Sequence, residues 1–201
     1  MGRYIVAISG ASGCIYGWRL VEVLADQGHS LYLLITDPAK QVMAFEMGWK
    51  INGDISEQRE AITRRLGPGR SQKINYLDYH DLTAVIASGS VKSDGMIVVP
   101  CSMATVAGIA HGLARNLVER SADVILKEKR PLVLVPRETP LNQIHLQNLL
   151  SLSRMGVTIL PAMPAFYTKP RTITELVDFI AGRVMDQLGL NHQLYEAWGD
   201  T

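Results

Sequence analysis

The sequence predicts a three-layer α/β fold, in which helices cover a doubly wound parallel sheet, built as a single domain. Short runs that are apolar throughout, such as 95–99 (GMIVV) and 132–135 (LVLV), alternate along the chain with segments of helical periodicity. Strands without a polar face are typical of a parallel sheet that is covered on both sides. The 201 residues show no internal repeat or low-complexity tract, and their number suits one domain.

Strand and helix patterns alternate in the first third of the chain. The expected strands are 5–9 and 30–36, and the expected helices are 13–27, 38–47 and a short one after 54. Gly28 suits the end of the first helix. Asp37 is expected to cap the second helix, with Pro38 at its first position. Asp54 and Glu57 have the spacing of a capping box, which predicts the third helix.

Residues 67–93 carry mainly loop signals, such as Gly-Pro-Gly at 67–69, and predict no clear element. Beyond them the alternation resumes. The expected strands are 95–99, 132–135 and 157–160, and the expected helices are 102–111, 116–129, 140–155 and 172–188. Ser102 predicts an N-cap, Thr172 with Glu175 predicts a capping box, and Gly156 and Gly189 suit helix ends.

Composition and charge exclude several classes of protein. Twenty Lys and Arg against 19 Asp and Glu leave a net charge of +1, which excludes a strongly basic nucleic-acid-binding surface but not a local basic pocket. The two cysteines, Cys14 and Cys101, are too few for a disulfide framework. No apolar run approaches the roughly 20 residues of a membrane span, and no signal peptide precedes the first strand. We expect a cytoplasmic protein that binds neither nucleic acid nor membrane.

The loops after the strands are the first place to look for a site, because ligands of such sheets bind at the carboxyl ends of the strands. The loop 9–17 reads SGASGCIYG, and its glycines would let backbone N–H groups approach a phosphate or a ring at a helix start. It resembles in outline the glycine-rich turn of short-chain dehydrogenases, but no tyrosine of this chain is followed four residues later by lysine. A nucleotide or flavin site is predicted, and a simple strand-to-helix turn is the alternative.

Two further strand-end loops contain polar residues. The segment 100–105 (PCSMAT) places hydroxyls at a helix start, although Ser102 could serve only as an N-cap. Arg137 and Glu138 follow the expected strand 132–135. A charged pair at this place either serves a ligand site or is a solvated ion pair on the surface. Arg120 and Lys127 are seven residues apart and lie within about 20° on a helix, so they could face one anion or simply be solvated.

Other catalytic signatures do not occur in the chain. None of the five histidines has the spacing of a metal site, and no nucleophile elbow is present. No metal is therefore expected. Cys14 and Cys101 are interpreted as buried structural residues.

The segments together resemble the flavin prenyltransferase (UbiX-like) family almost from end to end, least so over 48–79. The matching stretches are 10–13 (GASG), 42–46 (VMAFE), 87–90 (ASGS), 100–102 (PCS), 116–124 (NLVERSADV), 126–128 (LKE), 130–138 (RPLVLVPRE), 144–146 (IHL), 166–167 (FY), 176–179 (LVDF) and Arg183. The run 116–138 is the most specific.

The resemblance implies a Rossmann-like or flavoprotein-like domain over 1–190 that binds FMN, and a C-terminal tail, 191–201, at a subunit interface. It implies transfer of a dimethylallyl group from dimethylallyl monophosphate to reduced FMN, at N5 and then at C6, without a metal. The product, prenylated FMN, would serve a UbiD-type decarboxylase. It also implies a homo-oligomer, typically a dodecamer, whose sites lie at subunit interfaces.

Roles for individual residues follow from the same resemblance. The residues expected to contact FMN are Gly10, Ala11, Ser12, Thr36, Ser102, Met103, Ala104, Thr105 and Arg137. The residues expected to take part in catalysis are Ser12, Glu46, Lys127 and Glu138, with Glu46 removing a proton during ring closure. The residues expected to bind the substrate phosphate are Arg120, Lys127, Tyr167 and Arg183. Trp198 would offer a second aromatic face across an interface.

Two alternative functions are kept. A flavin-dependent cysteine decarboxylase would carry Pro-x-Met-Asn near the last strand, whereas residues 161–164 read Pro-Ala-Met-Pro. A non-catalytic FMN carrier would need the cofactor loops but would have no use for Glu46, Lys127, Glu138 and Arg183 together.

Overall fold

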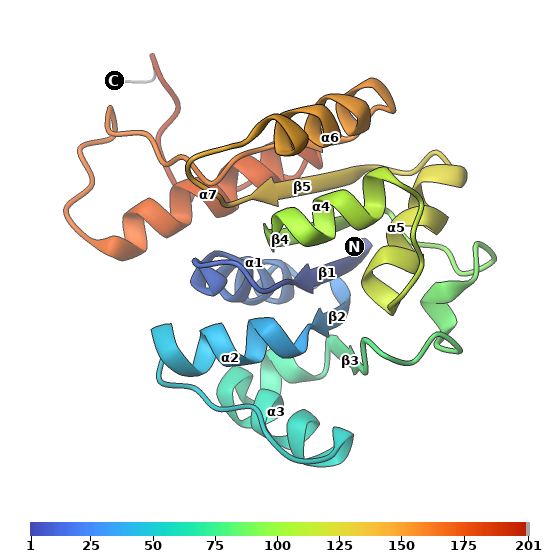
Figure 1. The fold of residues 1–201 in the computed structure, drawn as a ribbon. Coiled ribbons are helices and arrows are strands. Elements are labelled where there is room, and N and C mark those ends of the chain that lie inside the picture. The colour runs from blue at the N-terminus through green and yellow to red at the C-terminus, as the bar shows by residue number, and fades with distance from the viewer. Residues whose placement is uncertain (200–201) are drawn as a thin grey trace.

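Six parallel strands form one sheet in the computed structural model, which describes residues 1–199 (Figure 1). The strands are β1 (Arg3–Ile8), β2 (Ser30–Ile35), β3 (Ile74–Leu77), β4 (Gly95–Cys101), β5 (Leu132–Pro136) and β6 (Thr158–Ile159). Their order is β3-β2-β1-β4-β5-β6. The order reverses between β1 and β4, so the ligand crevice of such a sheet is expected at their carboxyl ends. The predicted fold class is confirmed, and the end of the predicted tail, 200–201, lies outside the described residues.

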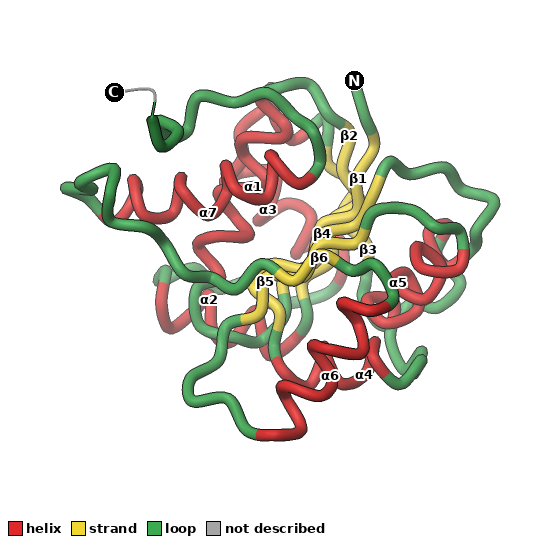
Figure 2. Tube along the Cα trace, turned by 90° about the horizontal axis from the view of Figure 1, so that it is seen from above, coloured by secondary structure: helices red, strands yellow, loops and turns green. Residues whose placement is uncertain are grey.

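Helices cover both faces of the sheet (Figure 2). They are α1 (Cys14–Asp26), α2 (Asp37–Glu46), α3 (Ile55–Ser71), α4 (Met103–Ala110), α5 (Leu117–Lys127), α6 (Gln143–Arg154) and α7 (Ile173–Gln187), with a 3-10 turn, η1 (Val85–Ala87). Side chains of α1, α2, α3 and α7 share one buried cluster with the sheet, and those of η1, α4, α5 and α6 share the other. Within residues 1–199, no helix has the length and hydrophobicity needed to cross a bilayer.

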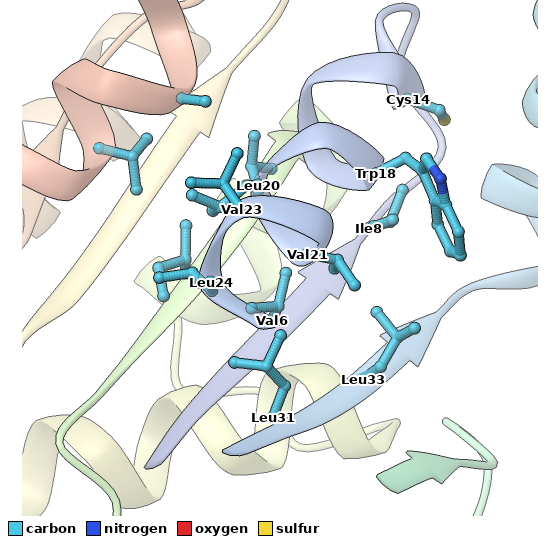
Figure 3. Packing of buried hydrophobic residues seen from close by; sticks show 14 of the residues in the cluster. Val6, Ile8, Cys14, Trp18, Leu20, Val21, Val23, Leu24, Leu31 and Leu33 are labelled. Atoms are coloured by element: carbon cyan, nitrogen blue, oxygen red, sulfur yellow. The ribbon is translucent and has the colours of Figure 1, made fainter. Parts of the chain in front are cut away.

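Strand β1 shows why the strands of this sheet carry apolar residues at almost every position. Val6 and Ile8 pack into the α1 side of the core, in the buried cluster that Figure 3 shows together with Leu20, Val21 and Leu24 of α1. Ile5 and Ala7 point to the opposite cluster. Successive side chains of a strand face opposite sides of a sheet, so a sheet covered on both sides demands apolar residues at every position.

Three helix starts differ in detail from the sequence-based expectation. The cap of α2 is Thr36, whose Oγ1 accepts a hydrogen bond from the Ala39 N–H at 3.2 Å, so the prediction of Asp37 as the cap was wrong. The predicted helix 140–155 begins later, because Asn142 caps α6 through the N–H of His145. Thr172 caps α7, but the Glu175 carboxylate accepts from the Arg171 N–H, so the full capping box does not form.

Segment 67–93, for which no clear element was predicted, contains a strand, the end of α3 and the 3-10 turn η1. The third predicted helix is long rather than short, and α3 runs through Gly67, whose φ of 76° and ψ of 168° break it into two helical pieces. Strand β3 follows at the edge of the sheet, with only Tyr76 fully buried. A four-residue edge strand with one buried position offers almost no periodicity, so no pattern predicted it.

Candidate functional site

Ser9 joins the two loops at which the strand order reverses. Its hydroxyl is buried, donates to the carbonyl of Pro100 at 3.0 Å and accepts the N–H of Ser102 at 2.7 Å. The loop after β1 is thereby held against the start of α4. No specific role for Ser9 could be predicted from the sequence alone, because its partners lie more than 90 residues away in the chain.

Two helices begin beside this loop, at the carboxyl ends of β2 and β4. Thr36 caps α2, and the Ser102 hydroxyl accepts the N–H of Thr105 at 3.3 Å and lies 3.0 Å from the Thr105 hydroxyl. The N–H groups of Met103 and Ala104, in the first turn of α4, have no partner within the helix. Helix N-termini with free N–H groups attract phosphate and other anions. Ser102 is therefore an N-cap, at a helix start that can attract an anion.

Glu46 reaches the glycine-rich loop from the far end of α2. Its Oε2 accepts a hydrogen bond from the Gly13 N–H at 2.9 Å. Glu46 and Ser12 line one cavity of about 350 Å³, together with Gly10 and neighbouring residues of α2. The structure thus brings together Gly10, Ser12 and Glu46, three of the residues singled out from the sequence.

Arg137 and Glu138 follow β5 at the same edge of the sheet. The Arg137 N–H donates to the carbonyl of Cys101 at 3.2 Å, which places it next to the β4 loop. Both residues line a cavity of about 320 Å³, whose wall includes Met163. Glu138 accepts from the N–H of Thr139 at 3.0 Å.

Tyr16 lies near these residues, although no sequence motif pointed to a role for it. Burial raises the pKa of its phenol, the positive charge of Arg137 opposes the rise, and the negative charge of Glu46 adds to it. The Tyr16 phenol therefore lies close enough to Arg137 and Glu46 for both charges to influence its pKa. Its place in the loop 9–17, three residues after Gly13, was the only signal that could have pointed to it.

Cys14 lies beside the same loop as a buried thiol. Burial, with a smaller contribution from the charge of Glu46, raises its pKa to about 12. Burial also raises the pKa of Cys101. Thiols with raised pKa values remain protonated and are poor nucleophiles. The interpretation of both cysteines as structural is consistent with this environment.

Arg120 and Lys127 do not join these residues within one chain. Lys127 ends α5 shortly before β5 begins, whereas Arg137 follows the other end of β5, about 13 Å along the strand. The Lys127 ammonium lies 3.8 Å from the Glu128 carboxylate. Arg120 donates to the carbonyl of Ala87 at 3.1 Å and pairs with Asp123 at 2.7 Å. A single copy therefore does not gather the predicted cations around one anion.

Arg183 lies on α7 with its guanidinium already partnered. Its Nη1 donates to the Asp186 carboxylate at 2.7 Å and to the Tyr195 hydroxyl at 3.2 Å. The hydrogen bond to Tyr195 is the main reason that the pKa of Arg183 is raised. About two-fifths of the side chain is exposed, so part of it can still meet a ligand.

Tyr167 is connected to Arg183 by a row of aromatic rings. The ring centroids of Tyr167 and Phe179 are 6.0 Å apart, and those of Phe179 and Tyr195 are 4.8 Å apart. On its other side Tyr167 meets Trp198 at 5.1 Å, and these two rings line a cavity of about 450 Å³. Tyr167 and Arg183, two of the four residues predicted to bind phosphate, are thus in contact with the C-terminal segment.

Residues 1–199 contain no group of three His, Cys, Asp or Glu side chains arranged to hold a metal ion.

Comparison with known proteins identifies the family. The model of the family described as Flavoprotein matches residues 2–185. A protein of Halalkalibacterium halodurans named flavin prenyltransferase UbiX is 49% identical over 199 residues, which cover 99% of this chain and 94% of the relative.

Solved structures agree with this sequence relationship. A dodecameric FMN-dependent UbiX-like decarboxylase from Escherichia coli O157:H7 has a TM-score of 0.86 and 41% identity, covering 98% of both chains. AnUbiX (PadA1), solved in complex with FMN and dimethylallyl pyrophosphate, has a TM-score of 0.85 and 36% identity, covering 100% of this chain and 98% of the other. The glycine-rich loop, the two helix starts and Glu46 thus lie in a chain that belongs to the flavoprotein family and, within it, to the UbiX flavin prenyltransferases.

Proposed function

We propose that this chain transfers a dimethylallyl group from dimethylallyl monophosphate to reduced FMN and so makes prenylated FMN. The observation that carries the proposal is the meeting of the glycine-rich loop, the start of α4 and Glu46 at one edge of the sheet. The relatives named flavin prenyltransferase and the neighbour that holds FMN with dimethylallyl pyrophosphate support it.

The residues at the crevice fit FMN. The free N–H groups of Met103 and Ala104 and the hydroxyls of Ser102 and Thr105 can donate to phosphate or ring oxygens. The remaining residues proposed to contact FMN are Gly10, Ala11, Ser12, Thr36 and Arg137. Gly10 has no room for a side chain, because a Cβ there would lie 2.3 Å from the Cβ of Pro38.

Acidic side chains would manage the protons of the reaction. Reduced FMN supplies the nucleophilic positions, N5 and then C6, to which the dimethylallyl group becomes bonded. Glu46 lines the cavity beside Ser12 and is held by the Gly13 N–H, so its carboxylate can accept the proton that ring closure releases. Ser12 and Glu138 are proposed to assist proton movement.

Cationic and phenolic side chains would bind the departing phosphate. Monophosphate is a poor leaving group, so donors such as Lys127, Tyr167 and Arg183 must stabilise the charge that develops on it. Arg120 is proposed to lie nearby. Lys127 ends α5 near the amino ends of the strands, whereas Arg137 follows the carboxyl end of β5. We therefore propose that another copy of the chain supplies Lys127 to the site.

An assembly of this kind agrees with the exposed apolar surface. Large side chains that a monomer would leave in water include Phe45, Ile144, Met163, Phe166 and Ile173. The E. coli O157:H7 neighbour is dodecameric, and we propose a homododecamer here. The tail beyond residue 190, whose Trp198 is 80% exposed, is proposed to lie at a subunit interface.

Prenylated FMN made in this way is proposed to pass to a UbiD-type decarboxylase in the cytoplasm. The carrier alternative would leave Glu46, Lys127, Glu138 and Arg183 without a role. The cysteine decarboxylase alternative is disfavoured, because Pro164 stands where that family has asparagine.

Anaerobic incubation of the flavin-loaded protein with dimethylallyl monophosphate, followed by mass spectrometry, tests the activity. The expected product is a flavin heavier by one C5 prenyl unit, and a parallel incubation with the diphosphate decides between the two donors. Only unmodified FMN in both incubations would favour the carrier.

Complementation tests the shared site. Ser12→Ala and Lys127→Met are each expected to be inactive alone. When the two variants are mixed under conditions that exchange subunits, some sites receive both native residues, so activity should return in part. A mixture that stays inactive after demonstrated exchange would contradict the supply of Lys127 by another copy.

A further inference from the structure

Three side chains from different elements form a stack beside the end of α2. Trp18 of α1 and Trp49, which follows α2, meet edge to face with ring centroids 4.5 Å apart. The guanidinium carbon of Arg65, on α3, lies 4.5 Å from the Trp49 centroid and 5.8 Å from the Trp18 centroid. A cation within about 6 Å of an indole face is attracted by the ring. Trp18, Trp49 and Arg65 are called the indole clamp below.

One side of the clamp is fixed to the first turns of α1. Trp18 is almost fully buried, and its indole N–H donates to Glu22 at 3.0 Å. Figure 3 shows Cys14 and Trp18 at the same end of α1, pointing to the same side of the helix. This is also the end of α1 at which the Gly13 N–H binds Glu46. The position of Trp18 is therefore tied to one partner of that hydrogen bond.

The other side of the clamp is fixed to the end of α2 that carries Glu46. After Glu46, Gly48 turns the chain with a φ of 62°, and the Trp49 N–H donates back to the carbonyl of Met43 at 3.3 Å. The helix itself buries only Ala39 and Met43, while Phe45 is 93% exposed. Val42 and Met47 pack against the same core cluster from this end of the helix, and Trp49 adds the contact with Trp18 of α1.

We propose that the indole clamp positions Glu46 for its proton transfer. By holding the end of α2 against the start of α1, the clamp sets the separation of the Glu46 carboxylate from the Gly13 N–H, which is 2.9 Å. Trp49 and Arg65 are positioning residues, since they act through Glu46. This role rests on the proposed function of Glu46. A displacement of about 1 Å at a reacting group can lower a rate by on the order of 100-fold, so a distant clamp can matter.

The test compares variants of the clamp with matched controls. Trp49→Ala and Arg65→Met remove the ring and the cation, whereas Trp49→Phe retains a ring and Arg64→Met removes a neighbouring exposed cation of α3. In protein without flavin, the Gly13 amide should exchange its hydrogen faster in Trp49→Ala and Arg65→Met than in the wild type and the two controls. In loaded protein, kcat should fall on the order of tenfold in the same two variants, with KM for dimethylallyl monophosphate and Kd for FMN unchanged.

Either of two results would overturn the proposal. Folded Arg65→Met and Trp49→Ala proteins with wild-type Gly13 exchange and wild-type kcat would show that Glu46 does not depend on the clamp. Equal losses in kcat, KM and FMN affinity would show a general packing role instead. If Trp49→Ala fails to fold, Arg65→Met decides. A wild-type protein that makes no prenylated flavin would refute the proposed function, while Gly13 exchange would still decide whether the clamp holds Glu46.

Discussion

Replacing Ser9 by alanine should loosen the crevice by separating its two central loops. The Ser9 hydroxyl makes two hydrogen bonds, to the Pro100 carbonyl at 3.0 Å and from the Ser102 N–H at 2.7 Å. The Pro100 carbonyl keeps a second donor, the Ser9 N–H at 3.2 Å, whereas the Ser102 N–H loses its acceptor. A partly buried donor left without an acceptor costs up to about 1–3 kcal/mol, which is the expected loss in the free energy of unfolding.

Thermal and urea unfolding of the protein without flavin measure this loss. For a chain of this size, about 1–3 kcal/mol corresponds to a fall in Tm of roughly 2–12 °C. FMN affinity should also fall, because Ser102 begins the helix whose free N–H groups face the crevice. Ser88→Ala is the matched control, since it removes an exposed hydroxyl that bonds only within its own loop. A Ser9→Ala protein with the stability and FMN affinity of the control would show that the Ser9 hydroxyl does not hold the two loops together.

Three further predictions concern Glu46, Cys14 and the assembly. Glu46→Gln should bind FMN normally but stop after the first bond to the flavin forms, as seen by mass spectrometry, and normal product would remove Glu46 from the mechanism. Because the pKa of Cys14 is raised from 9.0 to about 12, its thiol should be neutral at pH 8, and iodoacetamide should label it only above about pH 11 or after unfolding; rapid labelling of the native protein at pH 8 would contradict this. Size-exclusion chromatography should show a species far above the 22.2 kDa of one chain, and a monomer peak would count against a site shared between copies.

The sheet was predictable because its strands are defined by local patterns. The stretches 95–99 and 132–135 are apolar at every position, and β4 and β5 form there. Edge strand β3 was not predictable, because its burial pattern carries no period. The cap of α2 was misassigned for a similar reason: Thr36 and Asp37 are both good N-caps, and only the course of the chain after β2 decides between them.

The strand-end loops were recognisable from their composition, and the structure brings several of their residues together. Gly10, Ser12 and Glu46 line one cavity, and Arg137 is attached to the end of β4. Arg120 and Lys127 lie on one helix, as their spacing indicated, but away from Arg137 in a single chain. The spacing of two residues along a helix predicts that they share a face. Whether that face lies near the carboxyl or the amino ends of the strands depends on the direction in which the helix packs on the sheet.

The α/β class, most helix caps and the loops proposed to carry the chemistry could be predicted from local sequence, because each depends on residues within a few positions of one another. Which of these loops meet depends on contacts between residues far apart in the chain. Ser9 reaches Ser102 across 93 positions, Gly13 reaches Glu46 across 33, and Arg65 comes to lie over Trp18 and Trp49 from a third helix. These contacts follow from the order of the strands and the packing of helices on the sheet, which no local pattern encodes.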